Sequence, residues 1–298
     1  MTDIATTHSQ AQRLKADSLL LLAAFIWGIS FVAQRVAALN MGVYAFTGLR
    51  FLLGALVLLP FAWRRSSFSH LRGRDLQGIL MAGLLLFGGA ALQQSGMRFT
   101  TASNAGFITG LYVVFIPLIL VIGGLERPRR AVWLAAICAA AGLFLLSTGG
   151  QFRLAPGDAL VLVSAVLWAS HVIWVGRLVQ RLDPLEIAIG QYLVCGGLGL
   201  VVSLLSEGNV LPQAAAAWVA VLYTGLFSVA IGYTLQLVGQ RVAPPADAAI
   251  LLNLEAVVAA LTGWLVLDER LSAVQLLGCG LILAGMLLAQ VKIDKKTG

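Results

Sequence analysis

The side chains that could do chemistry in this 298-residue chain lie inside long apolar segments. In the first of these segments, four side chains recur at the spacing i, i+3, i+4 and i+7, and they are Trp27, Ser30, Phe31 and Gln34. Residues at this spacing share one face of an α-helix. A later segment carries a comparable group, Trp168, His171 and Trp174. Polar groups inside membrane-crossing segments usually face a cavity or a partner, so we predict that both groups line a cavity that binds a small molecule.

These two groups also have a structural interpretation. Tryptophan often anchors a helix at the membrane surface, but Trp27 and Trp168 each lie about ten residues into an apolar segment, which favours the cavity. A single histidine more often hydrogen-bonds within a packed interior than carries protons, and both roles stay open for His171.

Two charged side chains lie deep in apolar segments, and they are Glu255 and Arg50. An ionised carboxylate in such a place is costly, so Glu255 is protonated, paired with a cation or wetted by the cavity. Arg50 has a similar predicted depth and could be that cation. The alternatives for Glu255 are therefore a structural ion pair with Arg50, a part in ion coupling, or recognition of an amine on a substrate.

Further polar side chains in the apolar segments either contribute to the same cavity or hydrogen-bond between helices. Three of them are retained as binding candidates, namely Tyr112, Tyr223 and Asn253. The secondary candidates are Gln93, Asn104, Tyr233 and Gln236.

The sequence gives no sign of a catalytic residue, a metal site or a cofactor. The three cysteines, Cys138, Cys195 and Cys279, lie in apolar segments and do not have the spacing of metal ligands. The chain also lacks the short motifs of nucleotide-binding proteins, serine hydrolases and zinc proteases.

The composition requires these side chains to be positioned by membrane-spanning helices. Hydrophobic residues make up 59% of the chain and charged residues only 11%, whereas roughly a quarter of the residues of a soluble domain are charged. Apolar runs of about 20 residues can cross a bilayer as helices. We read ten such runs, at residues 18–38, 44–63, 76–96, 101–122, 131–148, 157–178, 185–205, 214–238, 246–267 and 272–291. The sequence therefore predicts an all-α integral membrane protein with ten transmembrane helices.

Positive charge decides the predicted orientation of these helices. If the N-terminus lies inside the cell, most of the 20 Lys and Arg residues fall in the inner segments. Basic residues in short loops are retained on the cytoplasmic side, so we expect both termini to be cytoplasmic and the protein to lie in the inner membrane. The net charge of +7 does not indicate a nucleic-acid partner, because the basic residues do not gather on one amphipathic face.

The chain contains an internal repeat. The segment 92–105 reads LQQSGMRFTTASNA and the segment 235–248 reads LQLVGQRVAPPADA, so Leu, Gln, Gly, Arg and Ala recur in register between them. Since each half has five predicted helices, an odd number, the second half must start on the opposite side of the membrane. We therefore predict two inverted five-helix repeats, residues 1–150 and residues 151–298, an arrangement that is common in secondary transporters.

Short sequence elements resemble those of a known family. The first predicted helix carries Trp27 followed by Gly28, and Trp168 takes the equivalent place in the sixth helix. An acid–Arg pair follows both the fourth and the ninth helix, as Glu126 with Arg127 and Glu269 with Arg270. Over about residues 18–291 this pattern is similar to the EamA family of the drug/metabolite transporter superfamily, and within it to amino acid exporters of the YddG type. The resemblance implies a carrier in which the first four helices of each half surround a central cavity, while the fifth and tenth support it.

We therefore expect a secondary transporter that moves a small organic solute by alternating access around a cavity in the middle of the membrane. Indole and phenol faces attract an ammonium group, which favours neutral or aromatic amino acids as substrates, with export as the expected direction. Drug-like cations, purines and nucleosides are alternatives for the same fold. A membrane-embedded enzyme is the alternative from another class, with Glu255 and His171 as its starting point. The expected partners are the small-molecule substrate and the lipid bilayer, and a monomer is compatible with the sequence.

Overall fold

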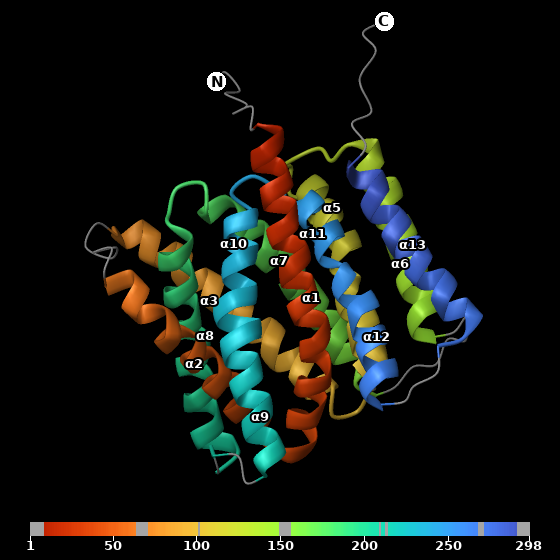
Figure 1. The fold of residues 1–298 in the computed structure, drawn as a ribbon. Helices are drawn as coiled ribbons and strands as arrows, with labels where there is room; N and C mark the ends of the chain where they lie inside the picture. Colours follow the sequence, from red (N-terminus) through yellow and green to blue (C-terminus); the bar gives the residue numbers. More distant parts are fainter. Residues whose placement is uncertain are drawn as a thin grey trace, which may run out of the picture.

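The fold is taken from a computed structural model that describes residues 9–63, 71–100, 102–148, 156–208, 210–211, 214–267 and 271–290. The first half contains α1 (Gln10–Asn40), α2 (Val43–Trp63), α3 (Gly73–Gly96), α4 (Ala102–Gly110), α5 (Tyr112–Ile122) and α6 (Arg130–Thr148). The second half contains α7 (Asp158–Leu178), α8 (Pro184–Ser206), α9 (Ala215–Tyr223), the π-helix η1 (Thr224–Tyr233), α10 (Thr234–Gly239), α11 (Pro245–Leu252), α12 (Leu254–Leu267) and α13 (Ala273–Gln290). Figure 1 shows these elements as one assembly of helices.

These elements form ten membrane spans. α4 continues into α5 as one span, α9, η1 and α10 form another, and α11 continues into α12. Eight spans are long and apolar enough to cross a bilayer, and the shorter apolar parts of α6 and α13 complete the ten. Helices suit lipid because each one satisfies its backbone hydrogen bonds within itself. The predicted fold, an all-α membrane protein of two inverted five-helix repeats, is confirmed.

The observed helix ends lie close to the predicted spans, except at the start of α1. That helix begins at Gln10, well before the predicted start at residue 18. The Ser9 hydroxyl accepts a hydrogen bond from the Gln12 amide nitrogen at 3.2 Å, and the Gln12 side chain accepts one from the Ser9 amide at 2.8 Å. This reciprocal cap stabilises polar turns that extend the helix beyond the apolar run.

Three spans contain irregularities that hydropathy does not predict. α4 and α5 are separated at Leu111, and α11 and α12 are separated at Asn253, in the corresponding span of the second half. At each break the backbone makes a short-range hydrogen bond, from the Val114 amide to the Leu111 carbonyl at 2.9 Å and from the Ala256 amide to the Asn253 carbonyl at 3.1 Å. The repeat therefore extends to the interruption of the fourth helix in each half. The eighth span contains η1, and π-helical segments are frequent at functional sites.

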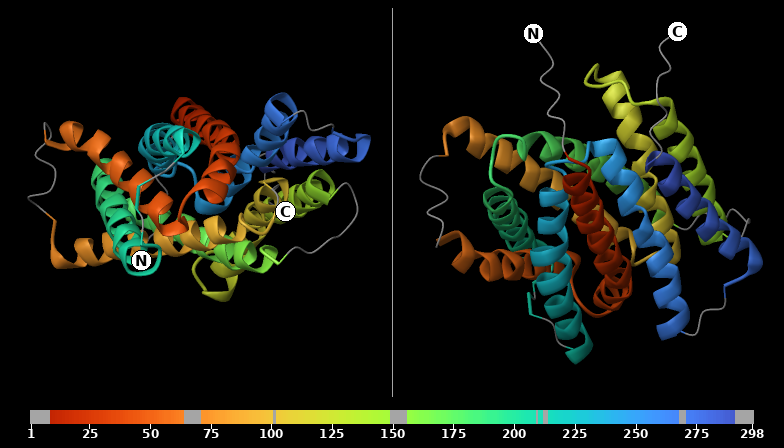
Figure 2. Two further views of the ribbon diagram at one scale, coloured as in Figure 1. Left: turned by 90° about the horizontal axis from the view of Figure 1, so that it is seen from below. Right: turned by 45° about the horizontal axis from the view of Figure 1, so that its top comes forward.

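The first helix of each half packs mainly against the other half. α1 lies against α9, η1, α10 and α12, whereas α7 lies against α3, α4 and α5. Equivalent helices also meet across the halves, because α2 packs on α8 and α6 packs on α13. Figure 2 shows the pair of α2 and α8 at one end of the molecule and the pair of α6 and α13 at the other. The two halves are thus interlocked instead of forming separate bundles.

Glycines allow the paired helices to approach closely. A Cβ atom at Gly199 in α8 would lie 2.6 Å from the backbone nitrogen of Gly48 in α2. A Cβ atom at Gly278 in α13 would lie 2.5 Å from the carbonyl oxygen of Gly142 in α6. Side chains cannot approach a backbone so closely, so glycine is required at these contacts.

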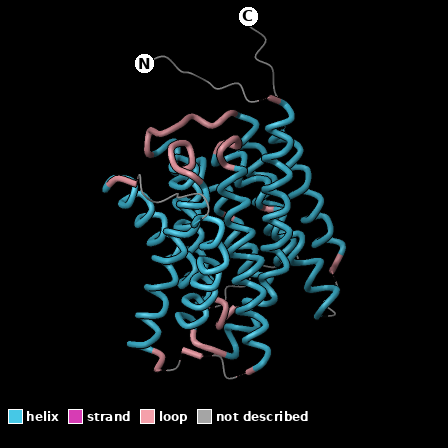
Figure 3. The backbone as a smooth tube through the Cα atoms, turned by 60° about the vertical axis from the view of Figure 1, so that its left-hand side comes forward, coloured by secondary structure: helices cyan, strands magenta, loops and turns pink. Residues whose placement is uncertain are grey.

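The outside of the molecule and the placement of its helix ends suit a bilayer. Many large apolar side chains lie on the outer faces, and four of them, Leu204, Leu205, Leu265 and Leu287, are 66% to 83% exposed. Such apolar exposure belongs in lipid and not in water. The start of α1 and the end of α13 lie at the same end of the molecule, as Figures 1 and 3 show, and an even number of spans requires this.

Candidate functional site

A cavity lies between helices of both halves. It encloses about 510 Å³ of space between atoms, including its open part, and the centre of a water molecule can occupy about 40 Å³ of it. A single water needs roughly 10–15 Å³ of the space that water centres can occupy, so the 40 Å³ in this cavity holds a few waters. A solute of the size of an amino acid requires the lining side chains to move apart. The lining consists of Trp27, Ser30, Phe31, Gln34, Arg50, Gln93, Thr109, Tyr112, Trp168, His171, Val172, Ser228, Tyr233, Gln236, Leu252 and Glu255.

The lining follows the internal repeat. Six pairs of lining residues are related by nearly the same offset along the chain, and they are Trp27 with Trp168, Ser30 with His171, Phe31 with Val172, Gln93 with Gln236, Thr109 with Leu252 and Tyr112 with Glu255. The first, third and fourth helices of each half therefore present equivalent positions to the cavity. Most partners differ in residue type, so the cavity is symmetric in position but not in chemistry.

Tyr233, the last residue of η1, lies at the centre of a cluster of rings. Its ring centroid is 4.6 Å from that of Trp27 and 6.0 Å from that of Trp168, on which it stacks at an interplanar angle of 23°. The rings of Phe51 and His171 lie 5.8 and 6.4 Å away. Aromatic pairs at such distances contribute about 0.5–1.5 kcal/mol each beyond the burial of their surface. Tyr233 therefore holds together the two tryptophans, one from each half.

Hydrogen bonds fix several other lining side chains. Trp27 donates from Nε1 to the carbonyl oxygen of Ser228 at 3.0 Å. The amide Nε2 of Gln93 donates to the Thr109 hydroxyl at 2.8 Å, which joins α3 to α4. His171 in α7 is held in a similar way, because its Nε2 lies 2.9 Å from Oε1 of the buried Gln191 in α8. The positions of these side chains are thus set before any solute binds.

Besides the Tyr112 hydroxyl, which lies beside Glu255, four polar atoms of lining residues are buried without a hydrogen-bond partner in the described part of the chain. They are Arg50 Nε, Trp168 Nε1, Gln34 Oε1 and Gln236 Oε1. A buried polar atom left in this state costs about 1–3 kcal/mol. Because two of these atoms are donors and two are acceptors, the wall of the cavity can offer both kinds of hydrogen bond to a polar solute.

Arg50 and Glu255 both line the cavity, but they are not joined by any of the ion pairs among the described residues. The guanidinium carbon of Arg50 instead lies 4.8 Å from the ring centroid of Phe46 and 5.0 Å from that of Phe51. Glu255, at the start of α12, lies beside Tyr112. The ion pair that the sequence offers as one explanation of Glu255 is therefore not formed in this structure.

Three predicted binding residues lie outside the cavity lining. Trp174 follows Trp168 by six positions, which turns it to another face of α7, where its Nε1 donates to a backbone carbonyl of α3 at 2.8 Å. Tyr223 donates from its hydroxyl to a backbone carbonyl of α1 at 3.3 Å. Asn253 is fully buried at the break between α11 and α12, and both its amide atoms lack a partner among the described residues. The spacing along a helix, not the residue type alone, decides which side chains reach the cavity.

The lining also contains residues outside the main set of predicted binding residues, some of them unpredicted and some predicted only as secondary candidates. The unpredicted ones are Thr109, Val172, Ser228 and Leu252, and the secondary candidates that reach the lining are Gln93, Tyr233 and Gln236. The alignment of the two repeats could have predicted several of them. Thr109 and Leu252 take equivalent positions, and Val172 is equivalent to the predicted residue Phe31. The side chain of Asn104 and the pair of Glu269 and Arg270 lie outside the described residues.

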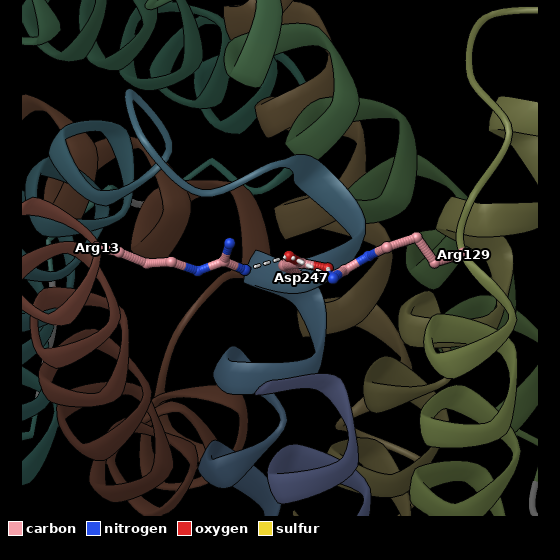
Figure 4. A network of polar contacts seen from close by, with 3 residues as sticks. All are labelled: Arg13, Arg129 and Asp247. Atoms are coloured by element: carbon pink, nitrogen blue, oxygen red, sulfur yellow. Dashed lines mark hydrogen bonds and ion pairs between the residues drawn. The ribbon is translucent and has the colours of Figure 1, made fainter. Parts of the chain in front are cut away.

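A network of ion pairs joins helices at the end of the molecule where α1 begins. Asp247, in the first turn of α11, accepts a hydrogen bond from Arg13 of α1 at 2.9 Å and from Arg129 at 2.9 and 3.0 Å, as Figure 4 shows. Arg129 lies directly before α6. The side chain of Asp247 is 9% exposed, whereas those of Arg13 and Arg129 are 35% and 46% exposed. A single carboxylate therefore ties α1 and the start of α6 to the ninth span.

Known proteins with similar sequences are transporters. The chain matches the model of the EamA-like transporter family twice, over residues 14–148 and residues 155–290. It is 30% identical to a protein of Archaeoglobus fulgidus that carries the name uncharacterized transporter, and the alignment covers 95% of this chain and 88% of that protein. It is 26% identical to the threonine/homoserine exporter RhtA of Escherichia coli strain K12, with 94% of this chain and 92% of RhtA covered.

A solved crystal structure has the same fold. The TM-score is 0.77, with 92% of this chain and 96% of the other chain covered at 22% sequence identity. The sequence resemblance thus agrees with the family match, with the named relatives and with the arrangement of the helices. From this agreement it follows that the chain belongs to the EamA-like transporter family, within the drug/metabolite transporter superfamily, and is a multi-pass membrane transporter.

Proposed function

We propose that this protein exports small neutral or aromatic amino acids by alternating access. The observation that carries the proposal is the cavity between the halves, whose lining combines a cluster of aromatic rings with buried polar atoms that lack a partner among the described residues. An amino acid uses both, because rings accept its side chain and ammonium group while the polar atoms bond to its charged ends. RhtA, a relative over most of the chain, is named as an exporter of threonine and homoserine, which are small neutral amino acids.

The inverted repeat supplies the means of alternating access. Both halves present equivalent positions to the cavity, so an exchange of conformation between the halves carries its opening from one side of the membrane to the other. The network around Asp247 joins the two halves at the end where α1 begins, and in this proposal it keeps that end closed in the present conformation. Ion pairs with partly exposed partners contribute about 0–1 kcal/mol each, so this closure can be broken in every transport cycle.

We further propose that the termini and the Asp247 network face the cytoplasm, with the protein in the inner membrane. The excess of basic residues in the segments at this end supports the orientation. A cysteine placed at the exposed Lys15 of α1 tests it. An impermeant thiol reagent should label this cysteine in inside-out vesicles and not in intact cells, and labelling in intact cells would contradict the orientation.

Reconstituted protein tests the substrate class. Purified protein in liposomes should transport labelled threonine, homoserine, leucine or phenylalanine at a saturable rate, and protein-free liposomes should not. The variant Lys15→Gln, which changes only an exposed charge, should behave like the unmodified protein. Transport of a drug-like cation, a purine or a nucleoside without transport of any amino acid would refute the proposal, and so would chemical conversion of the solute.

A further inference from the structure

We propose that Arg50 and Glu255 are the two charged anchors of a zwitterionic substrate, with Arg50 binding its carboxylate and Glu255 its ammonium group. This inference rests on the proposed function, because it concerns the same cavity and requires amino acids as substrates. It goes further by assigning the two ends of the substrate to two side chains and by predicting which solutes the cavity rejects.

Arg50 has the properties of a carboxylate-binding side chain. It is only 3% exposed and lines the cavity, and its Nε has no hydrogen-bond partner among the described residues. Its positive charge faces the rings of Phe46 and Phe51 but no carboxylate within ion-pair distance in the described part of the chain. A guanidinium has five N–H donors and binds a carboxylate through two parallel hydrogen bonds. A charged side chain at membrane depth without a fixed partner is by default a candidate functional residue.

Glu255 has complementary properties. It is 4% exposed, lines the same cavity and has no ion-pair partner among the described residues. It is the second residue of α12, directly after the break at Asn253, and the N-terminal turn of a helix favours a carboxylate. Tyr112, its equivalent in the first half, lies beside it. A cation that enters the cavity stabilises the ionised form of this carboxylate, so Glu255 can pair with an ammonium group.

The two charges come from different helices, Arg50 from α2 and Glu255 from α12, and no ion pair joins them among the described residues. α1 packs against α12 and also lies between the two helices in Figure 1, where α2 and α12 are on opposite sides of it. Opposite charges on separate walls of one cavity fit a dipolar solute with its carboxylate toward α2 and its ammonium toward α12. The rings of Trp27, Trp168 and Tyr233 lie in the same lining and can receive the substituent of the solute.

This arrangement discriminates by charge. A zwitterion pairs with both anchors. A simple cation leaves Arg50 buried and unpaired, and a simple anion leaves Glu255 buried and unpaired. Removing one partner of a hydrogen bond to a charged group costs roughly 10- to 100-fold in binding. The cavity should therefore prefer an amino acid over its amide, which lacks the carboxylate, and over its deaminated acid, which lacks the ammonium group.

Competition experiments on the unmodified protein in liposomes test the proposal without any substitution. The probes are counterflow of labelled threonine and of labelled phenylalanine, and the competitors are the unlabelled amino acid, its amide and its deaminated acid. The amide and the deaminated acid should need roughly 10- to 100-fold higher concentrations than the amino acid to compete equally. An amide that competes as well as the amino acid overturns the role of Arg50, and an equally effective deaminated acid overturns that of Glu255. In both cases the proposed function survives, whereas the absence of counterflow for every amino acid tested, including leucine and homoserine, refutes the proposed function and this inference together.

Two substitutions assign the anchors separately. In Arg50→Gln the amino acid should lose its advantage over the amide but keep its advantage over the deaminated acid. In Glu255→Gln the opposite pattern is expected. Arg74→Gln removes an exposed arginine at the start of α3 and is the matched control, which should show the unmodified preferences. If either variant loses its preference for the amino acid equally against the amide and the deaminated acid, the substituted residue has a structural role, and the assignment is contradicted.

Discussion

At the scale of single residues, Tyr233 shows how one side chain organises the cavity. Its ring contacts a tryptophan from each half, and it belongs to the π-helical part of the eighth span. Because Trp27 is also bonded to the Ser228 carbonyl in the same π-helix, the indole is held from two directions. The aromatic wall therefore depends on the local winding of this span as well as on residue type.

Substitution of Tyr233 tests the role of its ring. Tyr233→Ala should lower the initial rate of amino acid transport at least about tenfold, because displaced tryptophans no longer meet the substrate in the right geometry. It should also lower the free energy of unfolding by about 3–5 kcal/mol, the usual cost of deleting a large buried aromatic side chain. Tyr233→Phe keeps the ring contacts and should retain most of the rate. Rates in liposomes and thermal unfolding in detergent measure both effects, and a full rate in Tyr233→Ala would exclude the ring cluster from transport.

The sequence predicts part of this site for a clear reason. Trp27, Ser30, Phe31 and Gln34 share one helical face, and all four line the cavity. Trp174 illustrates the limit, since an aromatic residue in the right helix turns away when its spacing does not match the face. The place of Tyr233 could not be read from its spacing, because a π-helical turn changes which residues lie above one another.

At the scale of elements, the pair of α6 and α13 supports the cavity without entering it. Neither helix contributes to the lining among the described residues. Their contact depends on backbone-to-backbone approach at Gly142 and Gly278. Sequence analysis predicts both helices from their apolar runs, but a local pattern cannot show which glycine faces a neighbouring helix and which faces lipid. The breaks at Leu111 and Asn253 escape prediction because hydropathy does not report backbone hydrogen bonding.

A matched pair of glycine substitutions tests this support. Gly278→Ala places a Cβ atom 2.5 Å from backbone atoms of α6, whereas Gly280→Ala, two positions further along, meets nothing within 4 Å. We expect Gly278→Ala to destabilise the protein by about 1–3 kcal/mol through overpacking, and Gly280→Ala to leave stability nearly unchanged. Thermal unfolding in detergent compares the two variants. Both should keep the substrate preference of the unmodified protein, so a changed preference in Gly278→Ala would place α13 in the site.

At the scale of the whole molecule, the network around Asp247 connects the two halves at the end where α1 begins. Arg13 and Arg129 come from the first half and Asp247 from the second, so a movement of the halves that opens this end must separate them. Since both arginines are partly exposed, the network biases the population of conformations more than it stabilises the fold.

Asp247→Asn should therefore shift the protein toward a conformation open at this end. In a variant without its three native cysteines, a cysteine at Ser30 in the cavity reports access by its rate of reaction with an impermeant thiol reagent. The reaction from the Asp247 side should be faster in Asp247→Asn, with little change in thermal stability. Asp183→Asn is the control, because Asp183 pairs with Arg241 of the same half at 3.7 Å. An equal reaction rate in the two variants would argue against a gating role.

The interlocked halves also affect the order in which the protein can assemble during synthesis. α1 enters the membrane first, yet the helices on which it mainly packs begin at α9, well into the second half of the chain. Most of the packing partners of α1 are therefore absent until the second half of the chain has been translated. In a nascent chain that stops after α8, the face of α1 that packs on α9, η1, α10 and α12 is still exposed to lipid, so truncated products differ from the complete protein in the surface of their first helix.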